Sequence, residues 1–191
     1  MIELNAPLVL ASGSPRRKEI LNTMGIEFTV DISDVDETFD GAPQDAVLEL
    51  SRRKAVAVAA RHPDALVLAA DTLVYAEKTL GKPENRAHAV EMLKELSGKW
   101  HSVFTGLTLV NTTDGRIQQR VCETRVHFAE MTDEEIEAYA NSKEPLDKAG
   151  AYAIQGLGGM FIDRIEGSYS NVVGLPMSVL REMLAQNGKE N

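Results

Sequence analysis

The sequence predicts an α/β fold with a mixed, partly antiparallel sheet flanked by helices. Strand and helix patterns alternate over residues 8–97, as they do in chains built from βα units. Residues 100–111 and 116–128 both have strand composition, and Thr-Thr-Asp-Gly between them is a hairpin signal. The chain contains no internal repeat and no Pro- or Ser-rich linker, so we expect one domain over residues 1–191.

The elements of the first half follow from apolar spacing and stop signals. A strand begins at Leu8, and the helix after it starts at Pro15 and stops near Met24-Gly25. A longer helix carries an apolar stripe, and a nearly unbroken apolar run predicts a strand covered on both faces. The further predicted elements are a strand at 27–32, a helix at 43–61, the apolar strand at 65–74 and a helix at 84–97.

The second half combines the hairpin with shorter elements. Thr132 and Glu135 have capping-box spacing for a helix that ends near Ser142. Residues 144–159 are rich in glycine and turn formers. A short strand is predicted at 161–165, and a last helix begins at Pro176 and ends near Gly188.

Composition and charge exclude several classes of protein. The 43% hydrophobic and 26% charged residues are typical of soluble globular proteins, and no apolar run approaches a membrane span. The N-terminal residues lack a basic n-region, so we expect no signal peptide and a cytoplasmic location. Cys122 is the only cysteine, which excludes an intramolecular disulfide and a cysteine-built zinc site. The net charge of −9 argues against a protein that coats nucleic acid.

Two arginines lie in the first turn of a predicted helix, where positively charged side chains are unfavourable. Ser14 is the predicted N-cap and Pro15 the first helical residue, so Arg16 and Arg17 face the positive end of the helix dipole. A turn between strand and helix presents free N–H groups that suit a phosphate. The alternative is that both arginines point into solvent.

Three further charged residues have unusual surroundings. Asp71 ends the apolar run 65–70, where an ionised group needs a partner or a metal, although it could equally cap a loop. Lys54 lies within the apolar stripe of its helix, so it either reaches a partner or extends past the helix edge into water. Lys82 lies in a loop and is either a phosphate counter-charge or a solvated residue.

An acidic loop supplies oxygen ligands suited to a hard cation, although most such loops bind nothing. Magnesium takes one or two carboxylates and shares its other positions with phosphates and water, so one of these acids would suffice. The chain has neither a P-loop nor a dinucleotide motif, and its histidines lack metal-ligand spacing. Basic groups, a strand-end carboxylate and nearby acids together suit metal-assisted phosphoanhydride hydrolysis. The loop acids are Asp34, Asp36, Glu37 and Asp40.

Several motifs stand in order along the chain, beginning with Ser12-Gly13-Ser14-Pro15-Arg16-Arg17 followed by Glu19-Ile20-Leu21. This first motif resembles the signature of the Maf family of nucleoside triphosphate pyrophosphatases. The resemblance covers residues 7 to about 185, with further motifs in the family order. These motifs are Ala70-Asp71-Thr72, Gly81-Lys82-Pro83, Leu96-Ser97-Gly98, Val103-Phe104-Thr105-Gly106, Asp147-Lys148-Ala149-Gly150-Ala151-Tyr152 and Val173-Gly174-Leu175-Pro176.

The resemblance implies a Maf/ITPase-like fold with a substrate cleft between two lobes, and an enzyme that cleaves nucleoside triphosphates between the α and β phosphates. Residues 150–156 are similar to the dTTP and UTP pyrophosphatase subgroup; the alternatives are a 7-methyl-GTP-type enzyme and a nucleotide-binding regulator of septum formation. A divalent metal cation (Mg²⁺ or Mn²⁺) and a homodimer are also implied, with no nucleic-acid or membrane partner. The implied roles are general base for Asp71, metal binding for Glu37 and Asp71, base selection for Arg16, Thr72 and Gln155, and phosphate binding for Ser12, Ser14, Arg17, Lys54 and Lys82.

Overall fold

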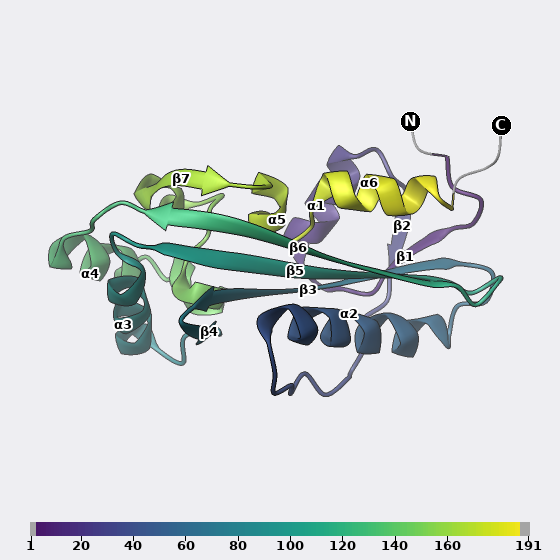
Figure 1. The fold of residues 1–191 in the computed structure, drawn as a ribbon, viewed down its shortest axis with the longest axis horizontal. Helices are drawn as coiled ribbons and strands as arrows, with labels where there is room; N and C mark the ends of the chain where they lie inside the picture. The colour runs from purple at the N-terminus through teal and green to yellow at the C-terminus, as the bar shows by residue number, and fades with distance from the viewer. Residues whose placement is uncertain (1–2, 188–191) are drawn as a thin grey trace. The chain divides into compact units, whose positions relative to one another are not determined.

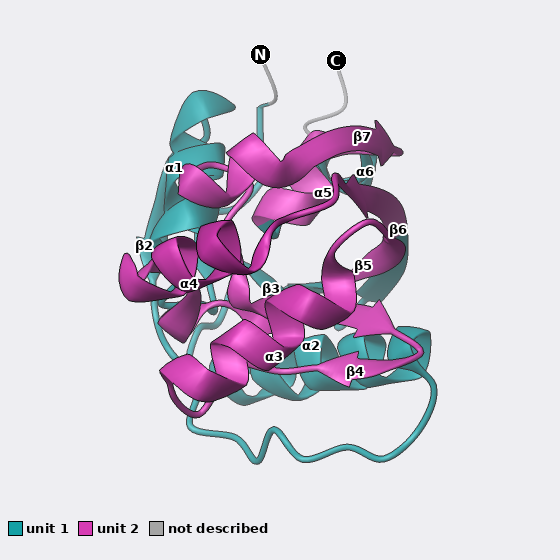
Figure 2. Ribbon diagram, turned by 90° about the vertical axis from the view of Figure 1, so that its left-hand side faces the viewer, with its two compact units in different colours: residues 1–71, 105–122, 174–191 teal, residues 72–104, 123–173 magenta. Residues whose placement is uncertain are grey.

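The computed structural model describes residues 3–187, and these form two compact units. Of the described residues, unit 1 takes 3–71, 105–122 and 174–187, and unit 2 takes 72–104 and 123–173 (Figure 2). Among the described residues, the strands form one seven-stranded sheet in the order β2-β1-β3-β5-β6-β7, with β4 paired to β3. The predicted mixed sheet is confirmed. Three strands contribute residues to both units: β3 (Leu66–Ala76), β5 (Trp100–Asn111) and β6 (Ile117–Phe128).

Unit 1 is built on parallel strands with helices on both sides. Leu8 of β1 is in register with Phe28 of β2 and with Leu66 of β3, and both ladders are parallel. In Figure 1, α2 lies below these strands, and α1 and α6 lie above them. All residues of the predicted run 65–70 are buried, as a strand covered on both faces requires. The bounds in unit 1 are β1 (Leu8–Leu10), α1 (Pro15–Thr23), β2 (Phe28–Val30), α2 (Pro43–Ala59) and α6 (Met177–Ala185).

Gly106 of β5 lets the strand approach the backbone of α2 closely. A Cβ at this position would lie 2.2 Å from the carbonyl oxygen of Val47, which the helix cannot move. We therefore expect Gly106→Ala to lower the free energy of unfolding by about 3 kcal/mol, the range of overpacking in a close-packed core. Urea unfolding measures this change. Gly81→Ala is the control, because a Cβ on Gly81 would meet nothing within 4 Å; equal losses in both variants would contradict the close approach.

Unit 2 packs its α-helices and a run of short 3₁₀ helices around an apolar core. The capping box of α4 is present: Thr132 Oγ1 accepts from Glu135 N–H, and the Glu135 side chain accepts from Thr132 N–H. Leu93, Leu96, Phe128 and Ile136 are among the core residues. The bounds in unit 2 are β4 (Lys78–Leu80), α3 (Arg86–Leu96), α4 (Asp133–Asn141), the 3₁₀ helices Glu144–Asp147, Ala149–Ala151 and Leu157–Phe161, β7 (Ile162–Glu166) and α5 (Tyr169–Val173).

The structure differs from the predicted elements mainly where elements are short. Strand β4 has three residues and α5 has five, and neither was predicted, because neither is long enough to show a period. The helix predicted to end near Gly188 ends at Ala185, and Gly188 itself lies outside the described residues. Over residues 3–187 we find no helix with the length and apolar character needed to cross a membrane.

His101 is buried in unit 2 and makes stability depend on pH. Its Nε2 lies 2.8 Å from the hydroxyl of Tyr152, and burial lowers its pKa from 6.5 to about 4. As the pH falls from 6.5 towards 4, His101 therefore becomes protonated in the unfolded chain but stays neutral in the folded chain. This difference lowers the free energy of unfolding. We expect wild-type protein to lose about 3 kcal/mol over this interval through His101. Urea unfolding at several pH values should show a flatter profile for His101→Gln; an unchanged profile would contradict this assignment.

Candidate functional site

The turn between β1 and α1 is organised by its own serines. α1 begins at Pro15 with Ser14 as its N-cap, as predicted. The Ser14 hydroxyl makes no capping hydrogen bond; instead, the Ser14 N–H donates to Ser12 Oγ at 3.3 Å. Ser12 is buried, and Arg16 is half-buried. The turn therefore has a defined shape before any anion binds.

Arg17 points into unit 1 and supports this turn. Its Nε donates to the carbonyl oxygen of Gly174 at 2.9 Å, and its Nη1 donates to Ser12 Oγ at 3.0 Å. Burial lowers the pKa of Arg17 to about 10, while the Asp71 carboxylate acts in the opposite direction. The guanidinium therefore remains charged at neutral pH. Phosphate binding by Arg17 stays a prediction.

Lys54 joins the two acids that the sequence analysis singled out. Its Nζ donates to Asp71 Oδ1 at 2.7 Å and to Glu37 Oε2 at 2.9 Å. The side chains of Lys54 and Asp71 are only 13% and 14% exposed, whereas that of Glu37 is 63% exposed. The alternative in which Lys54 extends past the helix edge into water is therefore wrong. Two carboxylates and one ammonium form a cluster at the end of the buried half of β3.

The loop that carries Glu37 is tied to the same helix by Arg53. Arg53 Nη1 donates to the carbonyl oxygens of Asp36 at 3.1 Å and Thr38 at 2.9 Å, the two residues that flank Glu37. Thr38 N–H and hydroxyl donate to the Asp36 carboxylate, and these hydrogen bonds lower the pKa of Asp36. The acidic loop is thus held in one shape next to Lys54.

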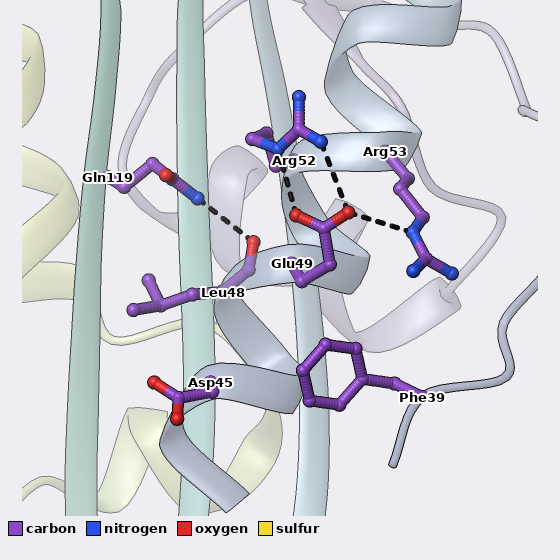
Figure 3. Close-up of a pocket in the computed structure, with 7 residues that line it drawn as sticks. All are labelled: Phe39, Asp45, Leu48, Glu49, Arg52, Arg53 and Gln119. Carbon is purple, nitrogen blue, oxygen red and sulfur yellow. Dashed lines mark hydrogen bonds and ion pairs between the residues drawn. The ribbon is translucent and has the colours of Figure 1, made fainter. Parts of the chain in front are cut away.

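Glu49 orients Arg53 at the edge of a shallow pocket of about 370 Å³ (Figure 3). Its carboxylate accepts from Arg53 Nε at 2.9 Å and from both Nε and Nη2 of Arg52. The hydrogen bonds from both arginines lower the pKa of Glu49 to about 2. No predicted site residue lines this pocket; its lining consists of Phe39, Asp45, Leu48, Glu49, Arg52, Arg53 and Gln119.

The remaining predicted site residues belong to unit 2. Thr72 follows Asp71 in β3 and is half-buried. Lys82 is exposed, and the neighbouring Gly81 carbonyl accepts from Gly150 N–H at 3.1 Å. Gln155 is exposed and precedes the 3₁₀ helix Leu157–Phe161. In unit 1, the structure brings Glu37, Lys54 and Asp71 into direct contact.

A family model described as "Maf-like protein" matches residues 7–187 of this sequence. The chain belongs to the Maf family. Proteins called dTTP/UTP pyrophosphatase are similar over nearly their whole lengths. The relative from Desulforamulus reducens is 47% identical over 187 residues, covering 96% of this chain and 98% of its own length. The relative from Bacillus anthracis is 49% identical over 182 residues, 94% of each chain.

A third Maf relative, from Syntrophus aciditrophicus, is also called dTTP/UTP pyrophosphatase. It is 48% identical over 188 residues, which cover 97% of this chain and 92% of its own length. These relatives confirm the resemblance to the dTTP/UTP subgroup of the Maf family. Among solved structures, "The structure of the Staphylococcus aureus Ham1 protein" has a TM-score of 0.46 at 14% identity, covering 65% of this chain and 72% of that chain.

The donor set of this Maf protein suits a hard divalent cation. Glu37 and Asp71 present carboxylate oxygens to the same ammonium group, so the two acids lie close together. Residues 3–187 contain no group of three or more His, Cys, Asp or Glu side chains that could hold an ion by themselves. Magnesium commonly takes one or two carboxylates and completes its shell with substrate phosphates and water. The acid pair therefore fits a cation that arrives with a phosphate.

Proposed function

We propose that this protein hydrolyses dTTP and UTP between the α and β phosphates, releasing the nucleoside monophosphate and pyrophosphate. One observation supports the chemistry above all: Lys54 holds Asp71 and Glu37 together at the end of a buried strand. Relatives nearly half identical over almost the full chain are called dTTP/UTP pyrophosphatase, which supports the choice of substrate. Acids with a neighbouring cation suit the attack of water on a phosphoanhydride.

In this proposal, Asp71 is the general base. Its carboxylate takes a proton from water as the water oxygen bonds to the α phosphorus, and the bond from that phosphorus to the bridging oxygen breaks. Pyrophosphate then leaves with the electron pair of the broken bond. Lys54 keeps Asp71 oriented by its 2.7 Å hydrogen bond and adds positive charge for the phosphates.

The other predicted residues bind and select the substrate. Ser12, Ser14, Arg17 and Lys82 are proposed to bind phosphate, and Arg16, Thr72 and Gln155 to select the base. The Gln155 amide offers both a donor and an acceptor to a pyrimidine edge. Glu37 and Asp71 would hold Mg²⁺ or Mn²⁺, which supplies Lewis-acid polarisation of a phosphoryl oxygen when bound.

A pyrophosphate-release screen tests the proposed function. Purified protein is incubated with dTTP, UTP, CTP and 7-methyl-GTP, with and without Mg²⁺ or Mn²⁺, and both pyrophosphate and orthophosphate are measured. We expect pyrophosphate from dTTP and UTP only when a metal is present. Release of orthophosphate as the first product would refute cleavage between the α and β phosphates. A preference for 7-methyl-GTP would move the protein to the other enzyme type, and binding without turnover would support a regulator.

We further propose that the chain acts as a single Maf domain that forms a homodimer in the cytoplasm. A nucleoside triphosphate substrate supports the location, because these nucleotides are made and used there. Light scattering of the purified protein gives its mass in solution, and a mass of one 20.9 kDa chain would refute the dimer.

The loop anchored by Arg53 provides a test of how Glu37 is positioned. Arg53→Gln removes the donors to the carbonyls on both sides of Glu37, so we expect kcat/KM for UTP to fall about tenfold, with a higher metal concentration needed for half-maximal rate. Arg52→Gln is the matched control, because Arg52 donates through Nε and Nη2 to the same Glu49 carboxylate that orients Arg53. An equal loss of kcat/KM in both variants would show that the effect comes from the ion pairs with Glu49 and not from the hydrogen bonds of Arg53 to the loop.

A further inference from the structure

The segment 153–158, which carries Gln155, is held at its first residue by a buried tyrosine. The N–H of Ala153 donates to the hydroxyl oxygen of Tyr139 at 3.2 Å. Tyr139 belongs to α4 and is only 3% exposed, so its ring is fixed by the core of unit 2. Its ring also packs against Phe161, with centroids 5.5 Å apart. One end of the segment is therefore attached to a rigid group.

The other end of the same segment is held by a carboxylate. Glu144 Oε2 accepts from Leu157 N–H and Oε1 accepts from Gly158 N–H, both at 3.0 Å. The Tyr139 hydroxyl donates to Glu144 Oε1 at 2.7 Å, which joins the two anchors. We call this Tyr139–Glu144 pair the loop clamp. It fixes both ends of a segment whose exposed middle residue is Gln155.

Two glycines make room for the loop clamp. A Cβ on Gly156 would lie 2.1 Å from Glu144 Oε2, and a Cβ on Gly158 would lie 2.5 Å from the Tyr139 hydroxyl oxygen. Any other residue at either position would push the carboxylate or the phenol away. The glycines on both sides of Leu157 are therefore needed for the backbone to reach these acceptors.

The charge of the loop clamp suits its task. Burial raises the pKa of Glu144, but hydrogen bonds from Gly158 N–H, the Tyr139 hydroxyl and Leu157 N–H together hold it below its ordinary value. Burial and the bond to Glu144 raise the pKa of Tyr139. At neutral pH the pair is thus an ionised acceptor and a neutral hydroxyl, the combination that makes strong hydrogen bonds to backbone N–H groups.

We infer that Tyr139 and Glu144 are positioning residues that fix the shape of segment 153–158 and thereby set the pyrimidine selectivity carried by Gln155. This inference rests on the proposed function, which assigns base selection to Gln155. Hydrogen bonds discriminate better between bases when donor and acceptor are held in place before binding, because less ordering is then needed on binding. UTP and CTP differ in the donors and acceptors of the pyrimidine edge, so their ratio of kcat/KM reports this positioning.

The test compares Glu144→Gln and Tyr139→Phe with Gln155→Ala. We expect each clamp variant to lower the UTP/CTP ratio of kcat/KM about tenfold, mainly through KM for UTP. In a Gln155→Ala background, adding Glu144→Gln should change the ratio little, because the clamp acts through Gln155. Amide hydrogen exchange at residues 153, 157 and 158 should become faster in the clamp variants, and this readout requires no catalysis.

Matched controls separate positioning from general damage. Glu137→Gln removes an acid of α4 whose partner is Arg86, and Tyr169→Phe removes the hydroxyl of an exposed tyrosine. Both should keep the wild-type ratio and exchange. An unchanged ratio in folded Tyr139→Phe, or the same drop with and without Gln155, would overturn the inference. Wild-type protein that releases no pyrophosphate from UTP would instead refute the proposed function, while the exchange measurement would still decide whether the clamp holds the loop.

Discussion

Asp71→Asn is expected to lower kcat for pyrophosphate release from UTP by about 10²–10⁴-fold, the contribution of a general base. The amide has the size of the carboxylate, and its oxygen can still accept the hydrogen bond that Lys54 Nζ makes at 2.7 Å. It cannot accept a proton from water at neutral pH. The fold should therefore persist while the chemical step fails, and KM should change much less than kcat.

The control for this variant is Asp64→Asn. Asp64 is exposed in the loop before β3 and has a φ of 54°, which asparagine tolerates well. Steady-state kinetics and urea unfolding of both variants separate catalysis from stability. Asp71→Asn activity within a few-fold of wild type would exclude Asp71 as the base. Recovery of full activity at high Mg²⁺ would instead assign Asp71 to metal binding.

The sequence shows which charged residues have unusual surroundings, but it does not show which partners they bind. Lys54 stands out because it interrupts an apolar stripe, and Asp71 because it ends an apolar run. Their pairing joins residues 17 positions apart in the chain, and the third member, Glu37, lies in a loop without periodicity. Local pattern therefore identifies charged residues that need partners, while the fold decides which partners they receive.

Arg17 shows the same division between local and long-range information. Its place at a positive helix end predicts an anion, but the structure gives it the carbonyl oxygen of Gly174, 157 residues away. Arg53, Tyr139 and Glu144 were missed altogether. Each acts by binding backbone groups of a distant loop, and such contacts have no sequence spacing. The sequence offered one signal for the last two residues, the glycines at 156 and 158. Such glycines indicate that another group approaches the backbone closely, but they do not identify that group.

Lys54→Met should produce the second large effect, and it acts on stability as well as on activity. The methionine keeps most of the side-chain volume in α2 but leaves Asp71, which is 14% exposed, without its counter-charge and facing Glu37. Removing one partner of a buried ion pair costs about 3 kcal/mol, and partial exposure makes about 2 kcal/mol our expectation here. Urea unfolding at pH 7 measures the loss. Pyrophosphate release should fall about 100-fold because Asp71 loses its orientation and the phosphates lose a cation.

The variant Lys54→Arg separates the two effects. It keeps a positive charge and should recover most of the stability, but its larger planar head places the donors differently from the ammonium, so activity should recover less. Full activity in Lys54→Met, or equal stability at pH 7, would contradict the central place of this lysine between the two carboxylates.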